Sequence, residues 1–454
     1  MCFPRIADET AIMSVPGRKV VRVKRTVLVQ FNSRKCGRRA GSGHNIYIEF
    51  EDLMNRIVAL SFIFLTAVAI AESTPTISPA ERSVANAMKA IAAKPKDCTG
   101  YNQLAIALSR RARETSDPTF YAAAEKALEK SFELSPGNLE AEKIQVWLAL
   151  GRHEFPDALR AAKALQEKTP NDVLVYGFLV DANAELGNYA EAEKAAQRML
   201  DLHPGNLPAL TRAAYLRELF GDIDGAFELM DMAYQATAVG ETEDRAWIVT
   251  QMAHLRLATG DTQAAEELVK QALSLFPGYH YALSNLARIR QMQGRRAESV
   301  SLLQQLYAAA PHAENLYLLA EGLEKAGRIH EAQSAFAEFE TKSLKEAVKK
   351  DNSSRELVFY YADHANEPVK ALQIAQQELA WRHDVYTLDA YAWALHVNHR
   401  DQEARKQIET ALAVGIRDLK LFQHAAAIEA DLGDQPSSER YKKEIVQLNR
   451  YEPH

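Results

Sequence analysis

The amino-acid sequence predicts an all-α solenoid of about ten antiparallel helix-turn-helix units. Prolines recur at intervals of 34 residues, at Pro136, Pro170 and Pro204 and again at Pro277 and Pro311. Glycines keep the same interval, from Gly187 to Gly221 and from Gly260 to Gly294. A fixed period of about 20–50 residues is typical of stacked supersecondary units, each of which packs only against its neighbours. With 47% hydrophobic and 25% charged residues, the composition is that of an ordinary folded protein.

Charge is distributed unevenly along the chain. Residues 1–53 contain ten Lys and Arg against five Asp and Glu, a net charge of +5. Residues 72–454 contain 43 Lys and Arg against 55 Asp and Glu, a net charge of −12. Binding of nucleic acid requires a basic surface that neutralises phosphates. The acidic array is therefore not expected to bind nucleic acid.

Residues 54–71 have the layout of a secretory signal peptide. A short positive start from Met54 to Arg56 precedes an uncharged apolar run, which ends in the small-residue pattern Ala69-Ile70-Ala71. The run is shorter than the roughly 20 apolar residues that span a bilayer comfortably. We therefore expect export to the periplasm or cell envelope. The alternative is that residues 57–71 are retained and anchor the protein to the inner membrane.

The segment ahead of this signal, residues 1–53, is expected to be an unstructured basic leader. A signal peptide acts from the N-terminus, so the hypothesis is that translation starts at Met54 and that residues 1–53 are a gene-model artefact. The remaining chain is predicted to comprise a linker and first helix (72–98), a repeat array (99–354), degenerate repeats with a C-terminal cap (355–448), and a tail (449–454).

The clearest unit runs from Val173 to Asn206. Its first helix is expected over residues 173–186, a turn at Gly187 follows, and a second helix is expected over residues 190–202. Pro204 and Gly205 then end the unit, because proline cannot continue a helix and glycine adopts the left-handed conformation that caps one.

This unit resembles the tetratricopeptide repeat. The residues that carry the resemblance are Tyr176, Gly187, Tyr189, Ala192 and Pro204. The same offsets recur at Gly260, Ala265 and Pro277, and at Gly294 and Pro311 with Ser299 in place of the alanine. The unit containing Gly151 and Pro170 fits only if two residues are inserted near residues 153–156. The resemblance is weaker after Asn366, where His399 replaces the turn glycine.

The resemblance implies an exported bacterial-type scaffold whose stack twists into a right-handed superhelix with a concave face. First helices line that face in the family, and they would bind a protein or peptide there. Aromatic and arginine side chains are favoured at interface hot spots. The predicted groove residues are Asp181, Tyr215, Trp247, Thr250, His254, Tyr281, Asn285, Arg288, Tyr317, Glu321, Asp389 and Trp393.

No motif for catalysis or cofactor binding accompanies the repeats. The sequence has no glycine-rich phosphate loop, no nucleophile elbow and no paired-cysteine metal site. His396, His399 and Asp401 are close in sequence, but we interpret them as surface residues and not as a metal site. The prediction is a protein without enzyme activity, cofactor or metal. Two alternatives stay open: a membrane-anchored adaptor, and an enzyme with an unrecognised helical active site.

Overall fold

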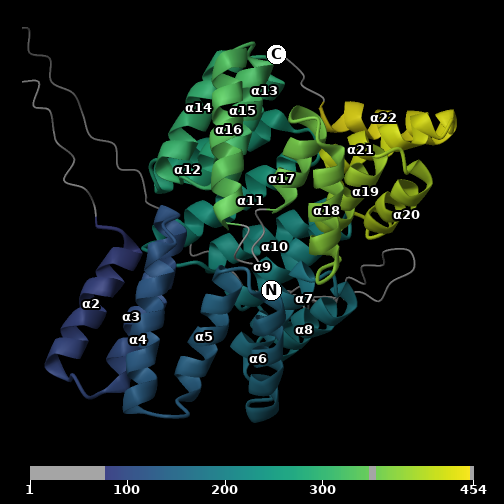
Figure 1. Cartoon of the computed structure of the whole chain (residues 1–454). Helices are drawn as coiled ribbons and strands as arrows, with labels where there is room; N and C mark the ends of the chain where they lie inside the picture. Colours follow the sequence, from purple (N-terminus) through teal and green to yellow (C-terminus); the bar gives the residue numbers. More distant parts are fainter. Residues whose placement is uncertain (1–76, 347–353, 450–454) are drawn as a thin grey trace, which may run out of the picture. The chain divides into compact units, whose positions relative to one another are not determined.

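The computed structural model describes residues 77–346 and 354–449, which form 21 α-helices and no strands (Figure 1). The predicted leader (1–53), the signal segment (54–71) and all but the first residue of the tail lie outside these residues. All the described helices belong to one contact unit. Among them, none combines the length and apolar character needed to cross a membrane.

The helices before residue 347 follow one another closely. They are α2 (Pro79–Ala93), α3 (Cys98–Thr115), α4 (Thr119–Leu134), α5 (Leu139–Gly151), α6 (Phe155–Lys168), α7 (Val173–Glu185), α8 (Tyr189–Leu202), α9 (Leu207–Leu219), α10 (Ile223–Ala236), α11 (Thr242–Leu257), α12 (Thr262–Leu275), α13 (His280–Met292), α14 (Arg296–Ala309), α15 (Ala313–Lys325) and α16 (Ile329–Glu346).

The helices after residue 353 include one π-helical turn, η1. They are α17 (Ser354–Phe359), η1 (Tyr360–His364), α18 (Pro368–Leu379), α19 (Val385–His396), α20 (Asp401–Leu412), α21 (Leu419–Asp431) and α22 (Gln435–Leu448).

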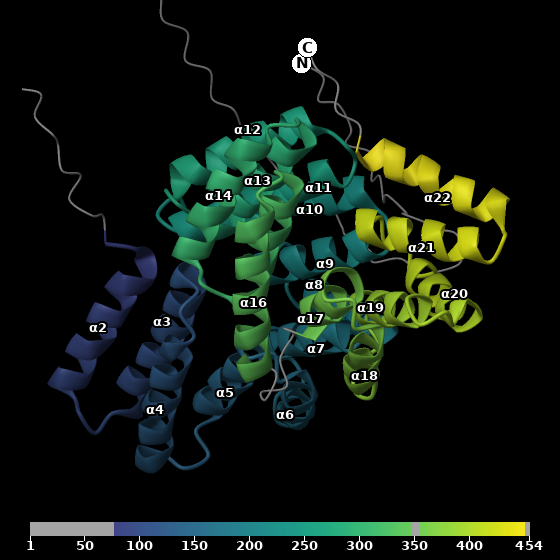
Figure 2. The same cartoon turned by 45° about the horizontal axis from the view of Figure 1, so that its top comes forward.

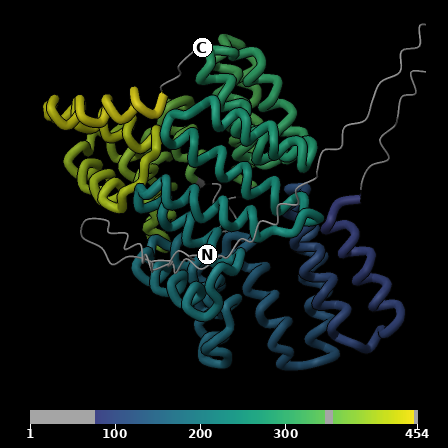
Figure 3. Tube along the Cα trace, turned by 180° about the vertical axis from the view of Figure 1, so that it is seen from behind, coloured from purple at the N-terminus to yellow at the C-terminus, as the bar shows by residue number. Residues whose placement is uncertain are grey.

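Consecutive helices pack as pairs. In the described residues, ten pairs follow α2, from α3 with α4 to α21 with α22, and η1 continues α17 in the eighth pair. The first helix of a pair commonly contacts the first helix of the next pair as well. Figure 3 shows this succession from behind. The predicted all-α helical-repeat fold is confirmed, and the expected helix boundaries in residues 173–202 are correct to within one residue.

Small side chains lie where the two helices of a pair approach each other. The predicted packing alanines Ala192 and Ala265 have no exposed surface. Ser299, which takes the alanine position in its unit, donates its hydroxyl to the carbonyl of Ala287 over 2.9 Å. A buried hydroxyl is tolerated when it is hydrogen-bonded, so the serine preserves the close packing.

The turn inside each unit requires a left-handed residue. Gly187, Gly260 and Gly294 have φ angles of 81°, 82° and 72°, which glycine adopts without steric cost. His399 replaces the glycine as predicted, with φ of 58°. The prediction for the second unit was wrong. Gly151 is the last residue of α5, and His153 has the left-handed φ of 60°. Because His153 is 17 residues before Pro170, as Gly187 is before Pro204, no insertion is needed.

Units far apart in sequence are also in direct contact. The backbone N–H of His383 donates to the carbonyl of Leu186 over 3.2 Å. The N–H of Val385 donates to the Tyr189 hydroxyl over 2.9 Å, so that α19 lies beside the α7–α8 hairpin (Figure 2). These contacts bring the degenerate units against the regular ones.

A second long-range contact joins α3 to the start of α11. The Arg113 guanidinium pairs with the carboxylates of Glu243 and Asp244. Glu243 is only 1% exposed and also accepts a hydrogen bond from the Tyr279 hydroxyl over 2.6 Å. The first unit is therefore held by charged groups about 130 residues further along the chain.

Candidate functional site: a polar pocket on the inner helices

Three of the predicted groove residues are held by neighbouring side chains. Asp181 accepts two hydrogen bonds from the Arg212 guanidinium, over 2.7 and 2.5 Å. The Nε2 atom of His254 lies 2.7 Å from a Glu218 carboxylate oxygen. The Trp393 indole N–H donates to Asp363 over 2.7 Å. Their polar atoms already have partners within the protein.

Three others, Thr250, Tyr317 and Asp389, are buried instead of lining a surface, with 2% exposure each. Neighbouring helices cover them. The Thr250 carbonyl accepts from Asn285 of the next first helix over 3.1 Å. Asp389 lies 2.7 Å from Nδ1 of His424, again on the next first helix. These three side chains therefore do not face an open groove, contrary to the expectation for the predicted groove residues.

The remaining predicted residues differ in their exposure to solvent. Tyr281 is 41% exposed, Trp247 is half-buried against the core, and Glu321 accepts from the Tyr317 hydroxyl over 3.2 Å. Arg288 is half-buried, and burial lowers the pKa of its guanidinium despite the attraction of Asp418. Within the described residues, Arg288 is the only sheltered arginine without a hydrogen bond, ion pair or ring contact.

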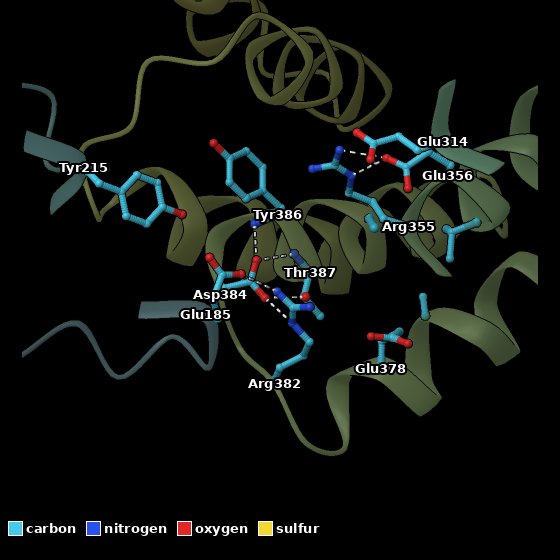
Figure 4. A pocket seen from close by; sticks show the side chains of 13 residues that line it. Glu185, Tyr215, Glu314, Arg355, Glu356, Glu378, Arg382, Asp384, Tyr386 and Thr387 are labelled. Atoms are coloured by element: carbon cyan, nitrogen blue, oxygen red, sulfur yellow. Dashed lines mark hydrogen bonds and ion pairs between the residues drawn. The ribbon is translucent and has the colours of Figure 1, made fainter. Parts of the chain in front are cut away.

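One predicted residue, Tyr215, lines a polar pocket of about 210 Å³. The pocket is formed by side chains from six helices and from the segment between α18 and α19, which Figure 4 shows converging. Its polar lining comprises Glu185 of α7, Tyr215 of α9, Glu314 of α15, Arg355 and Glu356 of α17, Glu378 of α18, Arg382 and Asp384 of the segment after α18, and Tyr386 and Thr387 of α19.

Two arginines are fixed at the pocket wall. Arg382 donates to Asp384 over 2.7 Å and lies 3.4 Å from Glu185. Asp384 also caps the start of α19 by accepting from the backbone N–H of Tyr386 over 3.1 Å. Arg355 donates to Glu356 over 2.9 and 2.7 Å. Each guanidinium thus already has a carboxylate partner from within the pocket.

Two carboxylates in the pocket have unusual acidity. Burial raises the pKa of Glu185 to about 7, although the neighbouring Arg382 opposes the shift. Burial and the nearby Glu356 carboxylate raise the pKa of Glu314 to about 7. Groups with such pKa values exchange protons near neutral pH. Perturbed acidity is more frequent among groups that line functional sites, although structural ion pairs also shift pKa values.

Most of the pocket was not predicted from the sequence. Most of the predicted groove residues lie away from helix ends, whereas Glu314 and Arg355 lie at helix starts and Glu185 at a helix end. Arg382 and Asp384 belong to the boundary between two degenerate units. The one sequence signal for them was the departure from the repeat pattern after residue 355.

Another polar group, His396 with Asp401 and Asp431, has side-chain atoms within 4.8 Å of one another. Nδ1 of His396 lies 2.6 Å from Asp401, and Asp431 is exposed. His399 is not part of this group, because it occupies the left-handed turn. Clusters of this kind are common at surfaces, and this one adds no ligand argument of its own.

The fold and the repeated turn geometry define a helical-repeat protein of the solenoid class. Two segments, residues 145–206 and residues 256–314, match sequence models of the tetratricopeptide repeat. These two segments therefore match the repeat that the sequence resemblance implied. A comparison with curated protein sequences found no match.

Several solved structures are similar in part. A chain of the APC/C hetero-tetramer Cut9–Hcn1 matches at 12% identity and a TM-score of 0.43, over 71% of this chain and 54% of that one. PilW, a type IV pilus biogenesis factor, matches at 13% identity and a TM-score of 0.39, over 46% of this chain and 94% of that one. The Naa15/Naa10 structure bound to HypK-THB matches at 13% identity and a TM-score of 0.27, over 81% of this chain and 61% of that one. The chain thus spans about half the length of the Cut9–Hcn1 chain.

Proposed function

We propose that this protein is a non-catalytic scaffold of the cell envelope, which binds a protein or peptide on the inner face of its helical repeats. The observation that carries the proposal is the convergence of six helices and one connecting segment on one polar pocket, which includes the predicted groove residue Tyr215. Tetratricopeptide repeats support a role in protein–protein interaction. The unpaired Arg288 and the exposed Tyr281 provide two further contact points of the types enriched at interface hot spots.

A scaffold is favoured over an enzyme by the chemistry of the pocket. The Thr387 hydroxyl donates to Asp384 over 2.5 Å, and that carboxylate also accepts from Arg382 and from the backbone N–H of Tyr386, so both groups take part in structural hydrogen bonds. The acidic lining and the net charge of −12 over residues 72–454 also argue against nucleic acid as the partner.

The proposed location depends on residues 54–71. Cleavage after Ala71 would release the protein into the periplasm, and retention of residues 57–71 would anchor it to the inner membrane. Mass measurement of the protein purified from its native source distinguishes the two. A mature mass that includes an intact 54–71 segment would exclude the cleaved form.

The binding proposal is tested with the full chain. A partner would be captured from the envelope fraction, identified and purified, and its affinity measured for the wild type and for Arg288→Ala and Tyr281→Ala. Loss of a hot-spot side chain costs about 2 kcal/mol or more, which is roughly a 30-fold weaker Kd. Arg296→Ala is the matched control, because Arg296 is exposed at the start of α14. A partner whose affinity is unchanged in both inner-face variants would contradict the proposal.

A further inference from the structure

The pocket contains more negative charge than its own arginines balance. Five carboxylates line it, against two guanidinium groups. Each arginine is already held by a carboxylate: Arg355 by Glu356, and Arg382 by Asp384 with Glu185 at a longer distance. With all groups ionised, the lining carries an excess of three negative charges. Such a pocket attracts a cation, and low-dielectric walls strengthen that attraction.

Glu314 is the acidic group with the least internal compensation. It lies in the first turn of α15, and no hydrogen bond or ion pair to it occurs within the described residues. Figure 4 shows its carboxylate beside Glu356 and the Arg355 guanidinium, at the opposite side of the view from Tyr215. Solvent still reaches the Glu314 side chain through the pocket, although the surrounding protein desolvates its carboxylate. An entering ligand can therefore reach it without displacing a structural ion pair.

Two tyrosines add hydrogen-bonding groups to the pocket lining. The side-chain hydroxyls of Tyr215 and Tyr386 have no hydrogen-bond partner in the described part of the chain. Burial raises the pKa of both well above the ordinary value, yet both residues are only half-buried and their hydroxyl oxygens reach solvent. Both hydroxyls are therefore available to pair with a group that enters the pocket. Hydroxyl oxygens and aromatic ring faces both accept cationic N–H groups.

We propose that the pocket binds the cationic head group of an arginine or lysine side chain that a protein partner presents, with Glu314 and Glu185 as its acidic contacts. The inference rests on the proposed scaffold function and adds the chemistry of the recognised group. A volume of about 210 Å³ is below the roughly 300–1,000 Å³ of pockets that enclose whole small molecules. That size fits one long side chain.

The acidity of the pocket supports the same ligand class. A bound cation relieves the repulsion and desolvation that raise the pKa of Glu185 and Glu314 to about 7. Binding then releases protons, so affinity should rise as the pH increases from 6 to 8. The charged groups that face these two carboxylates are Asp181, Arg355, Glu356, Glu378, Arg382 and Asp384.

The test uses the full chain and three probes. These are the capped pentapeptide Ala-Ala-Arg-Ala-Ala, the same peptide with uncharged citrulline in place of arginine, and agmatine as a free guanidinium compound. The arginine peptide should bind at least tenfold more tightly than the citrulline peptide, and more tightly at pH 8 than at pH 6. Equal binding of the two peptides would overturn the proposal. Agmatine binding as tightly as the arginine peptide would overturn the assignment to a partner's side chain.

Variants locate the binding. Glu314→Gln and, separately, Glu185→Gln should each weaken binding of the arginine peptide about fivefold or more. Glu129→Gln, an exposed acidic residue of α4 outside the pocket, should leave it unchanged. If neither pocket variant weakens binding, the pocket is not the site.

A captured partner whose affinity falls in Arg288→Ala but not in Glu314→Gln would refute this inference and leave the proposed function standing. An arginine peptide that binds at Glu314, without any partner on the inner face, would refute the proposed function instead.

Discussion

The backbone N–H of His383 donates to the carbonyl of Leu186, its partner 197 residues earlier in the chain. Gly187 follows Leu186 directly, with a φ of 81°, and a Cβ atom added there would lie 2.5 Å from the His383 carbonyl. The absence of a side chain at residue 187 thus permits both the turn and the contact with the distant unit. That contact positions Arg382 and Asp384, and hence one wall of the pocket.

Replacement of Gly187 by alanine should therefore lower the free energy of unfolding by more than the strain at the turn alone explains. Alanine at a left-handed φ costs about 1 kcal/mol, and displacement of the His383 backbone should add about 1–3 kcal/mol. The free energy of unfolding from urea titration measures the total. Gly294→Ala is the matched control, since Gly294 has a φ of 72° in an equivalent turn with nothing within 4 Å of the added carbon. Equal losses in the two variants would mean that the long-range contact adds no stability.

The sequence was sufficient for the repeats but not for this contact. The 34-residue period, the packing alanines and the left-handed His399 all follow from local steric needs, which a sequence records directly. His153 was missed because glycine is the expected residue in that conformation and Gly151 lies two residues away. The pairing of residues 186 and 383 has no local signal, because it depends on the rotation accumulated over several units. Alignment of the repeats identified a helical face, but not the later helices that cover Thr250 and Asp389.

The contact between α3 and α11 predicts that Arg113→Ala strongly lowers the free energy of unfolding. Within the described residues, loss of the guanidinium leaves the buried Glu243 carboxylate with the Tyr279 hydroxyl as its remaining side-chain partner. Removal of one partner of a buried pair typically costs about 3–5 kcal/mol. We expect about 3 kcal/mol in urea titration, because Tyr279 still donates. Arg160→Ala removes an exposed pair with Asp157 and should cost at most about 1 kcal/mol. Similar small losses in both variants would contradict a structural role for the Arg113 pair.

The pair of His254 and Glu218 predicts a pH-dependent contribution to stability. Burial alone lowers the pKa of His254, but the charge and hydrogen bond of Glu218 raise it overall above 6.5. Because the folded state binds the proton more tightly, the pair stabilises the protein fully below the unfolded pKa of about 6.5. The contribution is lost as the pH rises through the higher folded value.

The variant His254→Gln tests this direction. Its loss of unfolding free energy relative to the wild type should be greater at pH 6 than at pH 8.5, by about 0.5–1 kcal/mol after allowance for solvent screening. The difference between the two proteins cancels most of the titration of other groups. A loss that is independent of pH would show that His254 contributes packing but not charge.

Glu314 should behave in the opposite sense, as a carboxylate that weakens the fold. Its folded pKa of about 7 lies above the unfolded value of about 4.3, so ionisation is disfavoured in the folded state. Well below pH 4 both states are protonated and the penalty vanishes. It grows as the pH rises from about 4 to about 7 and is nearly constant above that range. Glu314→Gln should therefore raise the free energy of unfolding at pH 8 by about 0.5–1 kcal/mol, since exposure screens the repulsion. At pH 4 the Glu314→Gln variant should have nearly the wild-type free energy of unfolding, and Glu129→Gln should stay within about 0.5 kcal/mol of the wild type at both pH values.

A Glu314→Gln variant that is more stable yet binds the arginine peptide less well would show that the glutamate is retained for binding. A loss of stability at pH 8 would instead make Glu314 part of the structural framework.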